Sequence, residues 1–158
     1  MAKVLLGFMG AGKSTIARGL DSGYIDMDAL IEERLGMSIA DFFAEKGEEA
    51  FRQVESEVLV DLLKTDHVVS TGGGVVISQK NRDLLKTNPD NIYLKADFET
   101  LYQRIAADKD NRRPLFLNNS KEELREIFQE RQARYEEVAS RVLDVTKLSQ
   151  EEIIEELR

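Results

Sequence analysis

Hydrophobic residues in this chain form short runs that are separated by longer segments with helical periodicity. Five short segments rich in apolar residues are predicted to be β-strands: 4–8, 24–26, 67–70, 92–94 and 142–145. The run from Val4 to Phe8 is continuously apolar, which is typical of a strand buried on both faces of a parallel sheet.

Between these strands, apolar residues recur at intervals of three or four, and capping residues mark where helices begin. Ser120 with Glu123 forms a capping box at the start of a long helix, and Asp28 is predicted to cap a helix that Gly36 ends. Because strands and helices alternate, we predict an α/β fold. It is one domain, residues 1–158, with a five-stranded parallel sheet flanked by helices on both faces.

Residues 108–119 interrupt the periodicity. Twelve residues without a helical or strand pattern are long for a loop in a compact domain, so this segment is predicted to be a mobile lid. Arg112 and Arg113 lie within it. They could clamp a phosphate during its transfer, or they could belong to a solvated run of charges.

Overall charge limits the classes of partner. The chain has 22 basic and 30 acidic residues, a formal net charge of −8, which argues against a protein that binds nucleic acid or an acidic membrane. The absence of cysteine excludes thiol catalysis. A strand follows Met1 almost directly and no apolar run reaches membrane-spanning length, so we expect no signal peptide and a cytoplasmic location.

The first strand leads into a phosphate-binding motif. Residues 7–14, here called the phosphate loop, fit G-x-x-x-x-G-K-[ST] between a predicted strand and a predicted helix. Glycines allow backbone N–H groups to approach phosphate oxygens, and the helix adds further donors. Lys13 is expected to reach the β- and γ-phosphates, and the Ser14 hydroxyl is expected to ligate Mg²⁺.

Two further groups of residues follow strands at the edge of the sheet where ligands bind. Asp26 and Asp28 could hold a water on Mg²⁺ and bind or deprotonate a hydroxyl, or they could be a loop acid and a helix cap. The glycine triplet, Gly72–Gly74, allows close approach of the backbone to a ligand, since a plain turn needs fewer glycines.

Several arginines cannot be assigned from the charge pattern. Arg52 could be held by Glu55 and aimed at an anionic substrate, or it could belong to a solvated salt-bridge ladder. Among the acidic residues of the next long helix are three arginines that the pattern does not distinguish: Arg125, Arg131 and Arg134. His67 is the single histidine and is expected to be structural.

Taken together, these motifs resemble the shikimate kinases, which are P-loop kinases of the nucleoside-monophosphate-kinase-like group. The matching stretches are 7–15, 26–28, 38–39, 51–55, 70–74, 113–115, 130–131 and 135–139. The resemblance implies ATP-dependent phosphorylation of the 3-hydroxyl of shikimate, with Mg²⁺, in the synthesis of aromatic amino acids. It implies shikimate and ATP as partners, and we expect a monomer.

The resemblance also implies a role for each matching residue. The ATP-binding residues are Gly10, Ala11, Gly12, Lys13, Ser14, Thr15 and Arg113. The shikimate-binding residues are Asp28, Arg52, Gly73 and Arg131. Asp28, Lys13 and Arg113 would be catalytic, and Ser14 and, through water, Asp26 would hold the metal. The segment from Leu20 to Tyr24 is shorter than the family pattern, and the adenine contacts have no clear match.

Other functions are weighed against this one. A gluconate or nucleotide kinase would share the phosphate loop, but Asp28, Arg52, Gly73 and Arg131 favour a hydroxylated carboxylate as acceptor. A nucleotide-dependent switch or a catalytically silent binding module is a second alternative. It is disfavoured because every expected catalytic position is filled.

Overall fold

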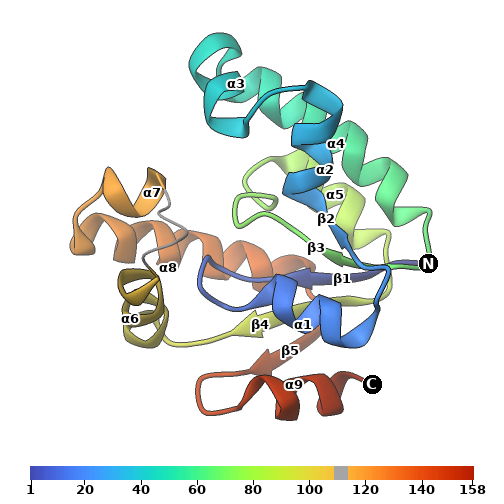
Figure 1. Ribbon diagram of the computed structural model, residues 1–158, viewed down its shortest axis with the longest axis vertical. Coiled ribbons are helices and arrows are strands. Elements are labelled where there is room, and N and C mark those ends of the chain that lie inside the picture. Colours follow the sequence, from blue (N-terminus) through green and yellow to red (C-terminus); the bar gives the residue numbers. More distant parts are fainter. Residues whose placement is uncertain (109–113) are drawn as a thin grey trace.

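The computed structural model describes residues 1–108 and 114–158. Its strands are β1 (Lys3–Leu6), β2 (Ile25–Asp26), β3 (Val68–Ser70), β4 (Asn91–Lys95) and β5 (Arg141–Asp144). Its helices are α1 (Lys13–Leu20), α2 (Met27–Leu35), α3 (Ile39–Lys46), α4 (Glu48–Leu63), α5 (Gln79–Lys86), α6 (Phe98–Ala107), α7 (Pro114–Leu117), α8 (Lys121–Val138) and α9 (Gln150–Leu157) (Figure 1).

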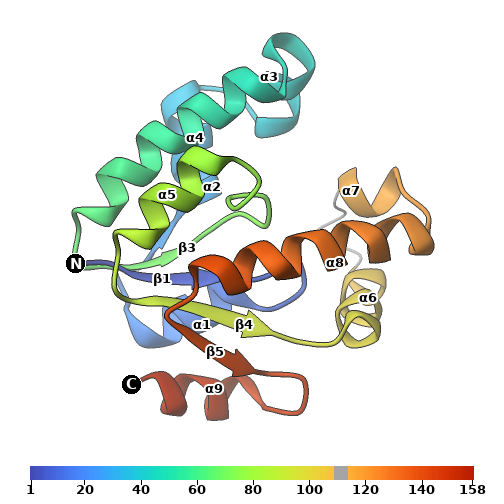
Figure 2. The same ribbon diagram turned by 180° about the vertical axis from the view of Figure 1, so that it is seen from behind.

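The strands form a single parallel sheet in the order β2-β3-β1-β4-β5, so the predicted fold class is confirmed. Helices α1 and α9 pack together on one face, and α4, α5 and α8 cover the other (Figures 1 and 2). The central strand β1 is buried from Val4 to Leu6, as the apolar run predicted. Parallel strands place their carboxyl ends at one edge, so the residues that follow β1, β2 and β3 converge there.

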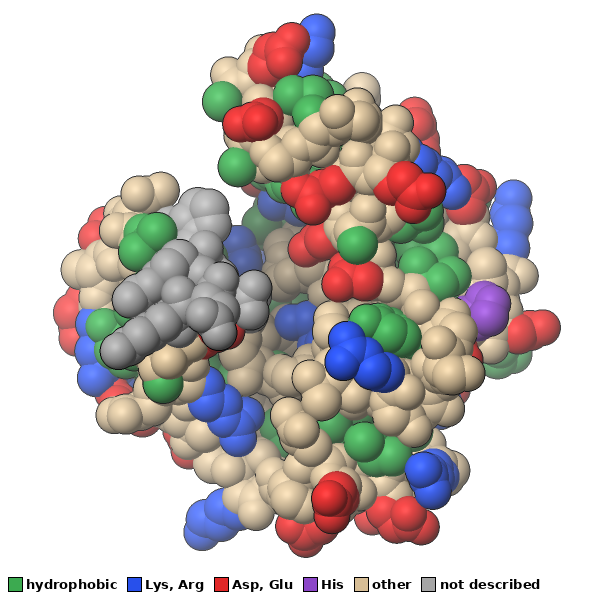
Figure 3. Space-filling model, viewed as in Figure 1, with side chains coloured by type: hydrophobic (Ala, Val, Ile, Leu, Met, Phe, Trp, Pro, Cys, Tyr) green, Lys and Arg blue, Asp and Glu red, His purple; other side chains and the backbone are tan. Residues whose placement is uncertain are grey.

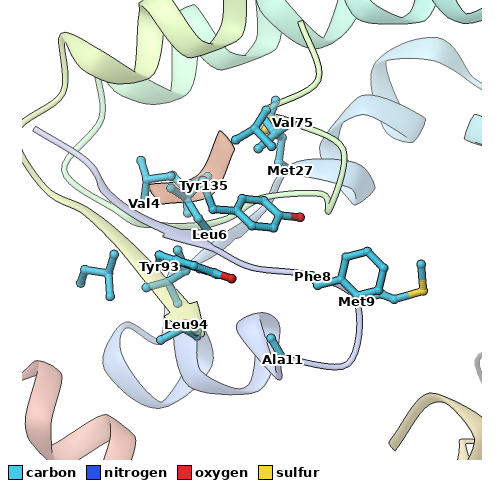
Figure 4. Close-up of a cluster of buried hydrophobic side chains, with 14 of the residues drawn as sticks. Val4, Leu6, Phe8, Met9, Ala11, Met27, Val75, Tyr93, Leu94 and Tyr135 are labelled. Carbon is cyan, nitrogen blue, oxygen red and sulfur yellow. The ribbon is translucent and has the colours of Figure 1, made fainter. Parts of the chain in front are cut away.

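Aromatic packing fixes α8 against the sheet. The rings of Tyr93 on β4 and Tyr135 on α8 have centroids 5.1 Å apart and lie side by side in the core (Figure 4). Phe8, just after β1, packs edge-on against Phe128 of α8 with centroids 5.4 Å apart. Because both contacts are buried, they hold the middle of α8 close to the end of β1 and its last turn against β4.

Two details of the local predictions are wrong. Asp26, rather than Asp28, is the N-cap of α2, because its Oδ1 atom accepts the backbone N–H of Ala29 at 3.2 Å. Asp28 lies in the first turn of α2, so its carboxyl group is available for the cleft. The aperiodic segment also contains a helical turn, α7, which is too short to show a period in the sequence.

The short connection behind the phosphate loop is tied to the sheet by Asp21. Its Oδ2 atom accepts the backbone N–H of Val68 and lies 3.1 Å from Nδ1 of His67, and its Oδ1 atom accepts the N–H of Gly23. This cluster joins the end of α1 to the start of β3, which agrees with a structural role for His67. Within the described residues, no helix is long and apolar enough to cross a membrane.

Candidate active site

A cleft opens beyond the carboxyl ends of the strands. Its volume is about 620 Å³, and its walls are the phosphate loop, the start of α2, residues 70–73 and the end of α6. Basic side chains are visible within the hollow, and acidic side chains gather on the α2 and α3 side of its rim (Figure 3). Among the described lining residues are the cations Lys13 and Arg104 and the acids Asp26, Asp28 and Asp108. The cleft therefore offers an anionic ligand two positive groups with carboxyl groups beside them.

The phosphate loop has the backbone that its sequence predicted. Gly10 and Gly12 have φ angles of 84° and 86°, which residues with a side chain rarely adopt. Nζ of Lys13 donates to the carbonyl oxygens of Gly7 and Phe8 at 2.6 and 3.2 Å. The loop and the lysine together form a concave, positively charged surface at the start of α1.

Hydroxyl and carboxylate oxygens lie beside the loop. The Ser14 and Ser70 hydroxyl oxygens are 3.0 Å apart, and Asp26 and Asp28 line the same cleft. These are hard oxygen donors, the type that Mg²⁺ prefers. Ser70 was missed at the sequence level. A hydroxyl at the carboxyl end of the strand beside β1 is the signal that would have found it.

Asp28 lies against Gly72. A Cβ atom added to Gly72 would be 2.6 Å from Oδ1 and 2.9 Å from Oδ2 of Asp28, so only glycine leaves room for the carboxyl group. Burial, and then the nearby negative charge of Asp26, raises the pKa of Asp28, while Lys13 opposes the rise. The structure therefore holds a carboxyl group with increased proton affinity near the phosphate loop.

Arg52 lies against the glycine triplet and is not part of a solvated ladder. Its Nη1 atom donates to Oε1 of Glu55 at 2.8 Å and to the carbonyl oxygen of Gly74 at 3.0 Å. The Arg52 side chain is only 15% exposed, and its guanidinium lies over the rings of Phe43 and Phe51. Glu48 is more distant, at 3.5 Å, and is largely exposed.

Arg131 and Arg134 differ in their surroundings. A Cβ atom added to Gly73 would lie 3.5 Å from Nη1 of Arg131, which also faces the ring of Phe8. The Tyr135 hydroxyl donates to the Gly73 carbonyl oxygen, so both side chains meet the glycine triplet. Burial lowers the pKa of Arg131. Arg134 instead pairs with the exposed Glu130 at 3.7 Å.

The glycine triplet serves close approach rather than unusual torsion angles. None of Gly72–Gly74 has a positive φ angle. Each glycine instead faces a different predicted site residue: Asp28, Arg131 and Arg52 in turn. The sequence identified the triplet, and the structure adds that Gly72 and Gly74 leave space for Asp28 and Arg52, whereas a Cβ atom at Gly73 would meet Arg131 at ordinary contact distance.

One predicted site residue is not among those that the structure describes, and one residue of the cleft was not predicted. Arg113 lies outside the described residues, as does Arg112. Arg104 of α6 was not considered at the sequence level, yet it lines the cleft and its Nη1 atom is 3.5 Å from the carbonyl oxygen of Gly10. Beside the phosphate loop, the glycine triplet thus brings one carboxyl group, of Asp28, close to the guanidinium groups of Arg52 and Arg131.

Comparisons with known proteins identify the family. The sequence model described as shikimate kinase matches residues 9–158. The shikimate kinase of Streptococcus gordonii is 52% identical and aligns over 100% of this chain and 99% of its own length, and that of Lactococcus lactis is 43% identical over 100% and 96%. A structure of the Acinetobacter baumannii shikimate kinase in complex with shikimate has a TM-score of 0.88 and 32% identity, and it covers 99% of this chain and 89% of that one.

Proposed function

This chain belongs to the shikimate kinase family and catalyses ATP-dependent phosphorylation of shikimate, and we propose that the described cleft is where it does so. The observation that carries the proposal is the convergence on the glycine triplet. Asp28, Arg131 and Arg52 each lie against one of its glycines, directly beside a phosphate loop. Donor and acceptor would therefore be held in one cavity, as a direct transfer requires.

The phosphate loop would hold the donor. Backbone N–H groups of Gly10, Ala11 and Gly12 and the start of α1 are suited to the phosphates of ATP. Lys13, now bonded to loop carbonyls, would move its ammonium group to the β- and γ-phosphates. Thr15 lines the same part of the cleft.

The acceptor would lie between the triplet and the two arginines. Arg52 and Arg131 would bind the shikimate carboxylate, and charge-assisted bonds from guanidinium groups suit a planar carboxylate. The backbone of Gly73 would add a contact. Asp28 would accept the hydrogen bond of the 3-hydroxyl group and align it with the γ-phosphate.

The reaction uses ATP together with a divalent metal, and we propose that the metal is Mg²⁺. The residues present fit that ion, because Ser14, Asp26 and Ser70 offer only oxygen donors. Ser14 would hold it directly and Asp26 through water. When bound, the ion neutralises charge on the phosphates of ATP.

The chain's own contribution would be positioning and charge. Asp28 orients the acceptor hydroxyl and receives its proton as the new P–O bond forms and the bond to the ADP oxygen breaks. Lys13 neutralises negative charge on the transferring phosphoryl group. Arg113 stays a predicted second cation there, and the monomeric state and cytoplasmic location also stay predictions.

An ADP-release assay tests the proposal most directly. Purified protein, Mg²⁺ and ATP are assayed with shikimate, gluconate and nucleoside monophosphates in parallel. We expect turnover with shikimate alone. Comparable turnover with gluconate or a nucleotide would refute the assignment of the acceptor pocket, and Ca²⁺ in place of Mg²⁺ tests the metal.

A further inference from the structure

Asn81 is a fully buried amide near the start of α5 that no proposed role explains. Its side chain has no exposed surface and lies between α5 and α4. Its Oδ1 atom accepts the hydroxyl of Ser56 at 2.6 Å, and its Nδ2 atom donates to Oε1 of Glu55 at 2.8 Å. The first bond fixes the orientation of the amide, so the second is directed at the carboxylate.

Glu55 connects this amide to the acceptor pocket. The same Oε1 atom that accepts Nδ2 of Asn81 also accepts Nη1 of Arg52 at 2.8 Å. Glu55 is 2% exposed, so water cannot replace either donor. An oxygen held from two directions has a defined position, and that position determines where the guanidinium of Arg52 lies.

The charge of Glu55 depends on the same contacts. Burial raises its pKa, and the charge and hydrogen bond of Arg52 and the hydrogen bond of Asn81 oppose that rise. Loss of the Asn81 donor would favour a neutral Glu55, which holds a guanidinium less firmly than a carboxylate does.

We propose that Asn81 is a positioning residue for the acceptor, acting through Glu55 to hold the Arg52 guanidinium toward the shikimate carboxylate. The inference rests on the proposed role of Arg52. The alternative is that Asn81 only satisfies the packing of α4 against α5, in which case its loss would lower stability without a selective effect on shikimate.

Asn88 provides the matched control. It is also a buried asparagine, and its Nδ2 atom donates to the carbonyl oxygen of Ala2 and to Oδ1 of Asn91. These contacts lie where β1 and β4 begin, at the edge of the sheet opposite the cleft. Asn88→Leu should lower the melting temperature but leave substrate binding unchanged.

The test compares Asn81→Leu, Asn88→Leu and Arg52→Lys by steady-state kinetics and by calorimetric titration with shikimate. We expect Asn81→Leu to raise KM and Kd for shikimate roughly tenfold, with kcat and the KM for ATP within about twofold of the wild type. If Asn81→Leu does not fold, Asn81→Ser, whose side chain is too short to reach Glu55, is expected to give the same selective rise.

The outcomes separate the two proposals. An unchanged KM for shikimate in Asn81→Leu, or an equal rise for ATP, refutes the positioning role even if Arg52→Lys weakens shikimate binding. If Arg52→Lys leaves shikimate binding intact, the proposed acceptor site is wrong, and the role of Asn81 fails with it.

Discussion

The carboxyl group of Asp28 occupies the space that a side chain on Gly72 would need. A Cβ atom there would lie 2.6 Å from Oδ1, well inside contact distance. Gly72 has no positive φ angle, so an alanine would be tolerated by the backbone but not by Asp28. A substitution at Gly72 therefore tests the position of Asp28 without changing its chemical group.

Gly72→Ala should therefore displace Asp28 and lower kcat by at least about tenfold, because a shift of roughly 1 Å at a reacting group costs one to two orders of magnitude. Binding of ADP to the phosphate loop should persist, which a fluorescent nucleotide titration would measure. Wild-type kcat in Gly72→Ala would mean that Asp28 does not need its present position.

Asp28→Asn should reduce kcat by about 10² or more, since the amide can orient a hydroxyl but cannot take its proton. It should also stabilise the protein at neutral pH. The folded-state pKa of Asp28 is raised, first by burial and then by Asp26, so the ionised carboxylate opposes folding above that pKa. The effect disappears below the unfolded pKa of about 3.9.

Two measurements check this pair of effects. Thermal unfolding of wild type and Asp28→Asn at pH 7 and pH 3 should show a higher melting temperature for the variant at pH 7 only. Relative to the wild type, Asp26→Asn should move the acid limb of the pH profile of kcat to lower pH, because the substitution removes one cause of the raised pKa of Asp28. If the acid limb stays at the same pH in Asp26→Asn, Asp28 is not the group whose titration limits kcat.

Arg131→Ala should raise the KM for shikimate by about 10- to 100-fold, as expected when a charge-assisted bond to a carboxylate is lost. Arg134→Ala should change it less than about twofold, because Arg134 makes an exposed pair with Glu130 at 3.7 Å. Parallel kinetics on the two variants decide the matter, and equal effects would show that the wrong arginine of α8 was chosen.

The sequence predicted what local patterns encode. Alternating apolar segments and capping boxes gave the parallel sheet and most helix boundaries, and the phosphate loop was identified from its spacing. Asp28 was misread as the cap of α2 because the sequence does not show which of the two acids the helix follows. Only the backbone path shows that Asp26 accepts the N–H of Ala29 and that the helix begins at Met27.

Contacts between distant segments were beyond such patterns. The hydrogen bond from Asn81 to Glu55 joins residues 26 positions apart, and Ser14 meets Ser70 across 56 positions. Arg131 was separated from Arg134 by family resemblance, and their charge pattern could not do so. The physical difference is their position on α8. The packing of Tyr135 turns one side of the helix toward Gly73, and Arg131 lies on that side.

Arg82 connects α5 to the segment that follows the glycine triplet. It is 7% exposed, and its Nη1 atom donates to the carbonyl oxygens of Val76 and Ile77 at 2.7 and 2.8 Å. Arg82→Ala should lower the free energy of unfolding by about 2–4 kcal/mol, since it leaves buried carbonyls unpaired. Denaturant unfolding measures this.

The neighbouring Lys86 is the control for Arg82. Its ammonium group pairs with Glu137 at 2.8 Å, but both side chains are more than 40% exposed. Lys86→Ala should therefore cost no more than about 1 kcal/mol. Arg82 also forms an ion pair with Glu137, at 3.4 Å. A similar loss in both variants would show that the carbonyl contacts of Arg82 contribute little beyond that ion pair.

Asp21, in the turn after α1, should make the stability of the protein depend on pH, because its pKa differs between the folded and unfolded states. Its pKa is lowered by the backbone N–H of Val68, then by His67 and the N–H of Gly23. A carboxyl group with a lowered folded-state pKa stabilises the protein above its unfolded pKa, and that stabilisation is lost as the pH falls through the folded pKa. Asp21→Asn should thus lower the melting temperature at pH 7, with a smaller difference from wild type at pH 3. Scanning calorimetry at both pH values tests this, and a difference that is independent of pH would mean that the charge of Asp21 does not contribute.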